Sequence, residues 1–194
     1  MPTRINENIY SAFKSRSVRE KLLYAARMKV YDSLCRGLPL HELSSVIDVG
    51  VTADKEHRSS NFFIKSFPYS DRITAFSDQD ASWMEDEYKG LVFVQGDGLD
   101  MPFDDHSFDL VFSSAVIEHV GSRDNQRQFI RECIRVAKKY VFITTPNRWY
   151  PLELHTGIPF IHYFPPKMYR KILRFLKKNF HEDEANLNLL SRAH

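Results

Sequence analysis

The middle of the chain contains the sequence Phe108-Asp-Leu-Val-Phe-Ser-Ser-Ala-Val-Ile-Glu-His-Val120. Its first part is a short run of Leu, Val and Phe without strict alternation of apolar and polar residues, which is typical of a strand buried on both faces of a parallel sheet. Two serines and an adjacent acid and histidine follow. This order predicts a buried strand that places polar side chains at one edge of a sheet.

Other apolar runs have the same character and alternate with segments that favour helices. The strands are predicted at residues 46–50, 72–76, 91–95, 109–113 and 140–144, and the helices between them at 60–67, 81–87 and 124–138. Alternation of strand and helix is typical of a doubly wound α/β fold. We therefore expect a mostly parallel sheet with helices on both faces.

A helical segment precedes the first strand. Between Ser15 and Arg36, apolar residues recur at steps of three and four with charged residues between them, as an amphipathic helix requires. We expect one compact domain, in which residues 1–43 are a helical preface, 44–147 the α/β core and 148–194 a cover on the side of the substrate.

The composition indicates an ordinary globular domain. The 194 residues are 43% hydrophobic, and the net charge of +2 gives no strong field that would favour nucleic acid as a partner. The two cysteines lack metal-ligand spacing, which indicates reduced thiols. No apolar run approaches the ~18 residues of a membrane span. We expect a cytoplasmic protein without a metal, a transmembrane segment or a nucleic-acid partner.

Four motifs resemble those of the class I S-adenosylmethionine-dependent methyltransferases, in particular the type 11 group. They are Val46–Gly50, Arg72–Asp78, Phe93–Phe103 and Phe108–Val120. The resemblance implies a Rossmann-like sheet that binds S-adenosylmethionine, and an enzyme that transfers its methyl group to a small or lipid/sugar-linked acceptor. The alternatives are a non-catalytic methyltransferase-like domain with a lost or altered cofactor site, and a nucleotide-binding module of another chemistry.

The resemblance also implies cofactor contacts at the ends of the strands. Asp97 matches the acid that contacts the adenine amine, and the Gly98 backbone would approach the ring; an aspartate that only caps a turn is the alternative. Asp48 and Gly50 match the start of the first motif, where glycine lets the backbone pass close to the methionine part of the cofactor. The simpler interpretation is a strand that ends at a glycine turn. Ser113 is expected in the same crevice.

Two departures from the family pattern bear on cofactor binding. The usual glycine-rich loop is replaced by Asp48-Val-Gly-Val-Thr-Ala-Asp54, so side chains stand where glycines are usual. Ser77 takes the place of the acid that contacts both ribose hydroxyls, and Asp78 follows it. Either Asp78 turns inward or ribose binding weakens by about 1–3 kcal/mol, the value of lost charge-assisted hydrogen bonds.

The candidate catalytic residues, Glu118 and His119, follow the fourth strand. Methyl transfer to oxygen or nitrogen requires an acceptor held in line and a base that removes its proton. Histidine titrates near neutrality in its ordinary state, which suits His119 to that role. The alternatives are a packing or surface histidine and a solvent-facing glutamate.

The residues after the fifth strand are aromatic and rich in proline. Asn147, His155 and His162 are candidate acceptor contacts there, and a basic amphipathic helix is predicted at 167–178. These segments suit either a wall of the acceptor pocket with peripheral membrane contact, or ordinary cover of the sheet. The remaining sequence is too short for the strand hairpin that usually completes this fold, and an uncovered sheet edge favours a homodimer.

Overall fold

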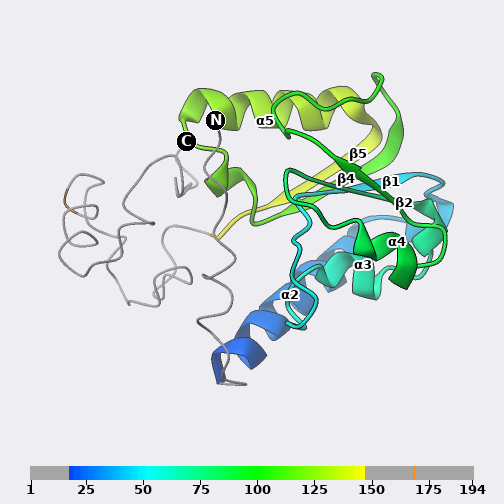
Figure 1. The fold of residues 1–194 in the computed structure, drawn as a ribbon, viewed down its shortest axis with the longest axis vertical. Coiled ribbons are helices and arrows are strands. Elements are labelled where there is room, and N and C mark those ends of the chain that lie inside the picture. Colours follow the sequence, from blue (N-terminus) through cyan, green and yellow to red (C-terminus); the bar gives the residue numbers. More distant parts are fainter. Residues whose placement is uncertain (1–17, 147–167, 169–194) are drawn as a thin grey trace.

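The computed structural model of the protein describes residues 18–146 and Met168. Residues 18–146 contain five strands, β1 (Val46–Val49), β2 (Ile73–Ser77), β3 (Val92–Gln95), β4 (Phe108–Ser114) and β5 (Ala137–Thr144). The helices are α2 (Val18–Gly37), α3 (Phe62–Ser66), α4 (Trp83–Glu87) and α5 (Arg123–Val136), with short 3-10 helices η1 (Leu40–Glu42), η2 (Ser70–Arg72) and η3 (Ile117–His119). Figure 1 shows the helices on both faces of the sheet.

The strands form one parallel sheet in the order β3-β2-β1-β4-β5. Val49 at the end of β1 pairs with Phe76 of β2 on one side and with Ser113 of β4 on the other. The chain therefore builds the sheet outward from β1 in one direction and then returns to continue in the other. The position between β1 and β4, where the order reverses, is where open α/β sheets bind ligands.

Helices α2, α3 and α4 cover one face of the sheet (Figure 1). The core on this face contains fully buried Leu34 of α2, Phe63 of α3 and Met84 of α4. The ring of Phe63 stacks on that of Phe112 in β4, with centroids 4.2 Å apart and an interplanar angle of 15°. This aromatic stack fixes α3 against the centre of the sheet.

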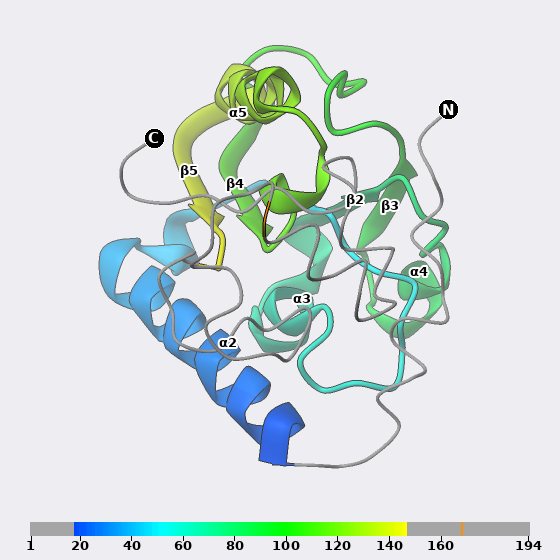
Figure 2. The same cartoon turned by 90° about the vertical axis from the view of Figure 1, so that its left-hand side faces the viewer.

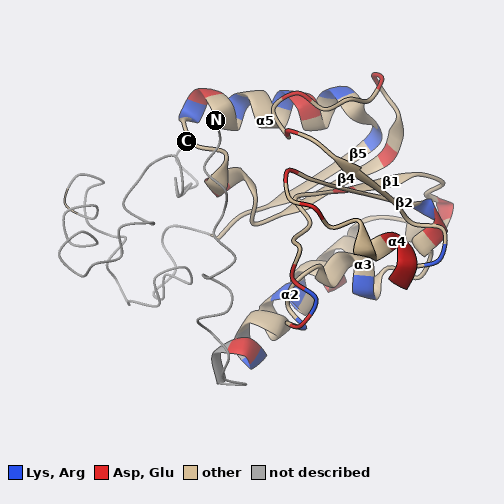
Figure 3. Cartoon of the chain, viewed as in Figure 1, with Lys and Arg blue, Asp and Glu red and all other residues tan. Residues whose placement is uncertain are grey.

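Helix α5 covers the opposite face, as Figure 2 shows in a view turned by 90°. Phe129, Cys133 and Val136 are fully buried there against strand residues such as Ile47 and Val111. Arginines and acidic residues are distributed along α5, whereas the strands carry few charges (Figure 3). The helix is amphipathic for that reason, and its apolar stripe is what the sheet buries.

The predicted doubly wound α/β fold is confirmed. All five predicted strands are present within a few residues of their expected limits, and the helix predicted between Ser15 and Arg36 corresponds to α2. The predictions for Asn147, His155, His162, the basic helix and the missing hairpin lie outside the described residues. Among the helices that are described, none is long and apolar enough to cross a membrane.

Candidate functional site

The parallel strands bring the predicted site residues to one edge of the sheet. Register pairs Val49 with Ser113 and Ser77 with Gln95, so the carboxyl ends of β1, β2, β3 and β4 lie side by side. Figure 2 looks onto this edge. The cofactor residues predicted from sequence are all at or next to it: Asp48, Gly50, Ser77, Asp78, Asp97, Gly98 and Ser113.

Ser113 holds the two central strands together at this edge. Its side chain is fully buried, and its hydroxyl donates a hydrogen bond of 3.0 Å to the carbonyl oxygen of Val49. The hydroxyl therefore stabilises the junction between β1 and β4 and does not reach the surface of the crevice.

Gly50 begins the loop after β1 in a conformation that favours glycine. Its φ is +92°, in the left-handed region, and its N–H donates to the carbonyl oxygen of Phe76 at 2.7 Å. A Cβ added to Gly50 would lie 2.2 Å from Cγ2 of Val116, in the segment after β4. Both the backbone conformation and the contact with Val116 thus require glycine here.

The glycine-poor loop is held in shape by the side chain of Asn61. Its Oδ1 accepts from the Thr52 N–H at 2.8 Å, and its Nδ2 donates to the carbonyl oxygens of Thr52 at 2.9 Å and Asp54 at 3.2 Å. Val51 is buried in the core on the α2 face. Two side chains thus stabilise a loop that lacks the usual glycines: that of Asn61 forms hydrogen bonds to its backbone, and that of Val51 packs into the core.

Asp54 forms a second anchor at the end of this loop. Its Oδ2 accepts from Ser60 Oγ at 2.6 Å and lies 2.8 Å from Nδ1 of His57, and its Oδ1 accepts from the Glu56 N–H at 2.9 Å. Burial raises the pKa of Asp54, but the hydrogen bonds from Ser60, Glu56 and His57 outweigh burial, so the pKa lies below its usual value. The ionised form of Asp54 therefore stabilises the loop.

A buried carboxyl group and a guanidinium interact electrostatically near the carboxyl end of β1. Burial raises the pKa of Asp48 to about 7, and the positive charge of Arg27 in α2 lowers it in part. Arg27 also donates a hydrogen bond to Ser114 Oγ, and its guanidinium lies 5.2 Å from the centroid of the Phe62 ring. Helix α2 thus brings a cation to the switch point between β1 and β4.

Arg27 was not among the residues predicted for the site. A signal was present in the sequence, because Leu23, Arg27, Val30 and Leu34 follow one another at steps of four, three and four residues. Arg27 is a charged residue in the stripe that faces the sheet. A cation at such a position has a specific partner in the core or a ligand nearby.

The end of β2 presents Ser77 and Asp78 differently. Ser77 is buried, and its hydroxyl accepts from the Gln79 N–H at 3.2 Å. Asp78 is exposed, and its backbone carbonyl accepts from Gln95 Nε2 at 2.9 Å. The carboxylate that stands at this strand end is therefore that of Asp78, displaced by one residue from the usual position.

Asp97 caps its own turn after β3. Its Oδ1 accepts from the Leu99 N–H at 2.8 Å, and its carbonyl accepts from the Asp100 N–H at 3.1 Å. The turn-capping alternative is therefore correct for one carboxylate oxygen, while the side chain remains exposed. A Cβ at Gly98 would lie 3.0 Å from the Phe129 ring, so that glycine serves the packing of α5.

Glu118 and His119 both lie in η3, directly after β4. Glu118 is fully buried, and its Oε2 accepts from Thr145 Oγ1 at 2.9 Å, so the alternative of a solvent-facing glutamate is wrong. His119 is half-buried, and its backbone N–H donates to the carbonyl oxygen of Val116. The sequence did not single out Thr145, whose contact with Glu118 joins the ends of β4 and β5.

A family comparison identifies a similarity in the middle of the chain. A profile for a family described as a methyltransferase domain matches residues 70–143. This part of the chain therefore resembles a methyltransferase domain. The match spans β2 to β5. It begins after Gly50 and the glycine-poor loop, so the loop that departs from the family pattern lies outside the matched residues.

Known relatives match short segments of the chain. Ajmaline N-methyltransferase of Rauvolfia serpentina is 51% identical over 45 residues, which cover 23% of this chain and 14% of that protein. An Encephalitozoon cuniculi protein whose name proposes a methyltransferase is 47% identical over 49 residues, which cover 25% of this chain and 23% of that protein. The match spans less than a quarter of the length of either relative.

The fold agrees over a longer range. A Thermotoga maritima structure, described as an S-adenosylmethionine-dependent methyltransferase and possible histamine N-methyltransferase, is 17% identical and superimposes with a TM-score of 0.58. The superposition covers 96% of this chain and 72% of that one. The chain therefore has the Rossmann-like fold seen in class I methyltransferases. The described residues contain no group of three His, Cys, Asp or Glu arranged to hold a metal ion.

Proposed function

We propose that the chain binds S-adenosylmethionine at the carboxyl ends of β1 to β4 and transfers its methyl group to a small or lipid/sugar-linked acceptor. The methyltransferase family match over residues 70–143 supports this activity. The position of the polar residues also supports it, since they lie at the carboxyl edge of the sheet, where sheets of this kind bind ligands.

The polar groups at this edge fit the chemistry of the cofactor. The exposed carboxylates of Asp78 and Asp97 can accept hydrogen bonds from ribose hydroxyls and from the adenine amine. Asp48 and Arg27 offer one acidic and one basic group for the ammonium and carboxylate of the methionine part. The cofactor, when bound, supplies a methyl group that its positive sulfur makes electrophilic.

The residues after β4 have separate roles in the proposed reaction. His119 takes the proton from an oxygen or nitrogen acceptor, because histidine can exchange a proton near neutral pH. Glu118 is buried and tied to Thr145, so its role is to position η3 and with it the His119 ring. The acceptor atom must also be aligned with the methyl group. The hydrogen bond between Glu118 and Thr145 favours this alignment because it holds the segments after β4 and β5 together.

The observation that carries this proposal is the exposed carboxylate of Asp97 at the end of β3, with only Oδ1 used in its own turn. The test is isothermal titration with S-adenosylhomocysteine. Asp97→Asn retains a carbonyl oxygen for the Leu99 N–H but replaces the other oxygen by an amide nitrogen, which cannot accept from the adenine amine. We expect an affinity at least 10-fold weaker, equivalent to about 1.4 kcal/mol.

The matched control is Asp86→Asn, which removes an exposed carboxylate from α4. It should leave the affinity unchanged. Equal affinity of Asp97→Asn and the unsubstituted protein would contradict the assignment of Asp97 to the adenine amine.

A non-catalytic methyltransferase-like domain is the second candidate. The observation that favours it is the packing of Val116 against Gly50, which fills space on one side of the first motif. The same titration separates the two proposals. A folded protein that does not bind S-adenosylhomocysteine at millimolar concentration would support an interaction role without methyl transfer.

A further inference from the structure

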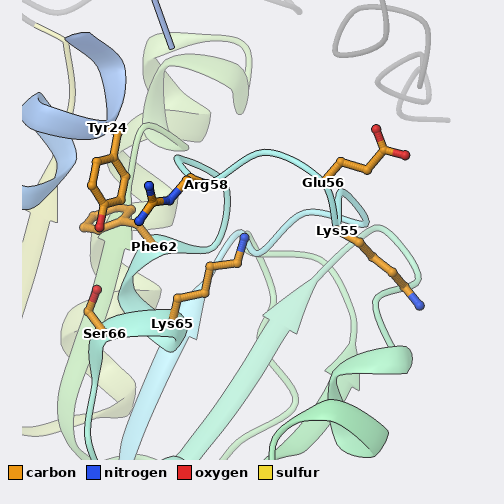
Figure 4. Close-up of a pocket in the computed structure, with 7 residues that line it drawn as sticks. All are labelled: Tyr24, Lys55, Glu56, Arg58, Phe62, Lys65 and Ser66. Atoms are coloured by element: carbon orange, nitrogen blue, oxygen red, sulfur yellow. The ribbon is translucent and has the colours of Figure 1, made fainter. Parts of the chain in front are cut away.

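A cavity of about 310 Å³ lies between α2, the loop after β1 and α3 (Figure 4). Tyr24 of α2 and Phe62 of α3 contribute aromatic rings to its wall, and Arg58, Lys65 and Ser66 contribute polar groups. None of the residues that line it belongs to the predicted cofactor set. Its volume is at the lower end of the range for small-molecule sites, roughly 300–1,000 Å³.

The charges around this cavity are unbalanced. Three cations, Lys55, Arg58 and Lys65, line it together with one carboxylate, that of Glu56. Within residues 18–146, none of these cations forms an ion pair with a carboxylate. Figure 4 shows the side chains of both Lys55 and Glu56 directed away from Arg58 and Lys65, and the Lys55 ammonium lies 4.7 Å from the centroid of the Trp83 ring. Arg58 and Lys65 therefore face the cavity without a directly paired carboxylate among the described residues, although the charges of Asp54 and Glu87 act on Lys65.

Arg58 and Lys65 are held in place by contacts that leave donors for a ligand. The Arg58 guanidinium lies 4.8 Å from the centroid of the Tyr24 ring, a stacking contact that does not use its N–H groups. Lys65 donates one hydrogen bond, of 2.9 Å, to the His57 carbonyl, and an ammonium has three donors. Burial lowers the pKa of Lys65, although Asp54 and Glu87 act in the opposite direction. A bound anion would favour the charged form of Lys65.

Ser66 provides a further donor at the base of the cavity. Among residues 18–146, the hydrogen bond of its hydroxyl is to the sulfur of Met28, at 4.0 Å, which is a weak acceptor. An oxygen of a bound anion would be a stronger acceptor for the same hydroxyl. Guanidinium, ammonium and hydroxyl donors together suit a phosphate or carboxylate group.

We propose that this cavity binds an anionic group carried on an aromatic ring, as in an aryl phosphate or an aromatic carboxylate. Arg58, Lys65 and Ser66 bind the anion, and the rings of Tyr24 and Phe62 pack against the aromatic part of the ligand. The proposal goes beyond methyl transfer, since binding at this cavity requires no cofactor.

The test is titration of the full chain with phenyl phosphate, followed by calorimetry and by the chemical shifts of the protein amides. The variants are Arg58→Ala and Lys65→Met, and the matched controls are Arg131→Ala and Lys138→Met, exposed cations at other places on the molecule. We expect saturable binding that is at least 10-fold weaker in the two cavity variants and unchanged in the controls. Thermal unfolding verifies that all four variants are folded.

Three further ligands define the chemistry. Benzoate should bind at the same residues, inorganic phosphate should bind more weakly because it lacks the ring, and benzyl alcohol should not bind because it lacks the charge. Absence of phenyl phosphate binding, or equal weakening by the control variants, would overturn the proposal. S-adenosylhomocysteine affinity should be unchanged in Arg58→Ala, so a failure of the proposed methyl transfer would be seen separately.

Discussion

Gly50 and Val116 pack against each other across the junction of β1 and β4, so closely that a Cβ on Gly50 would lie 2.2 Å from Cγ2 of Val116. The contact joins the loop after β1 to the segment that leads into η3. Gly50 is also the glycine that remains from the family's usual glycine-rich loop. Packing against Val116 is therefore a reason for glycine at position 50, in addition to the space that a cofactor would require.

Gly50→Ala should strongly destabilise the fold. Alanine is disfavoured at a φ of +92°, and its methyl group would overlap Val116. We expect the free energy of unfolding to fall by about 2–4 kcal/mol, as measured by urea denaturation. Gly37→Ala is the control, because no atom lies within 4 Å of the added methyl group at the end of α2; it should be neutral or slightly stabilising.

The raised pKa of Asp48 predicts a stability that falls with increasing pH. The carboxyl titrates near 7 in the folded protein and near 3.8 in its ordinary state, so the folded state binds the proton more tightly. Stability is lost as pH rises between these values. Asp48→Asn should therefore gain stability relative to the unsubstituted protein across this range, by at most about 1.4 kcal/mol per pH unit. Urea denaturation at about pH 5 and pH 8 measures the difference.

Asp109 provides a control of opposite sign. Burial raises its pKa, but the hydrogen bond from the Ser44 N–H and the contact with Lys139 outweigh burial, so the pKa lies below its usual value. The stabilisation from Asp109 is present above the ordinary pKa and is lost as pH falls through the folded pKa. Asp109→Asn should thus be destabilised at neutral pH and approach the unsubstituted protein in acid. Parallel pH profiles for both variants would contradict these assignments.

Arg27→Met should destabilise the protein more at high pH than at low pH. The substitution removes the hydrogen bond to Ser114 and the positive charge that favours ionised Asp48. We expect a loss of about 1–3 kcal/mol near pH 8 and a smaller loss near pH 5, where Asp48 is protonated. In the background of Asp48→Asn the pH dependence of the loss should disappear. Lys29→Met, an exposed cation of the same helix, should have little effect.

Substitutions of Asn61 should separate its hydrogen bonds from its backbone conformation. Asn61 has a φ of +51°, and its side chain makes three hydrogen bonds to the loop after β1. Asn61→Gly loses the hydrogen bonds without strain, at about 2–3 kcal/mol. Asn61→Ala should lose about 1 kcal/mol more because it also opposes the left-handed conformation. Equal stabilities of the two variants would show that φ has no part in the effect.

Local patterns were sufficient to predict the strands and the edge at which the polar residues lie. Strands such as β4 are runs of apolar residues buried on both faces, and a parallel sheet places their carboxyl ends together. Asp48, Ser77 and Asp97 were predicted as site residues from the resemblance to class I methyltransferases. Their use in binding the cofactor stays a prediction, because position at an edge does not by itself establish a contact.

Contacts between distant segments are what the sequence did not reveal. Arg27 reaches Ser114, Asn61 holds Thr52, and Val116 packs against Gly50. Each pair is brought together by packing on the α2 face of the sheet or at the junction of β1 and β4. A sequence pattern within one segment does not indicate which distant side chain that segment will contact.

The chain's own periodicity and motifs were thus enough for a parallel α/β sheet with a methyltransferase-like edge, because burial and strand direction are local consequences of residue order. Which groups stand at that edge was decided by tertiary packing. Burial raised the pKa of Asp48, the charge of Arg27 lowered it in part, and the Asn61 side chain formed hydrogen bonds to the first loop. Electrostatic energies and side-chain hydrogen bonds depend on distances in space, which only the assembled fold defines.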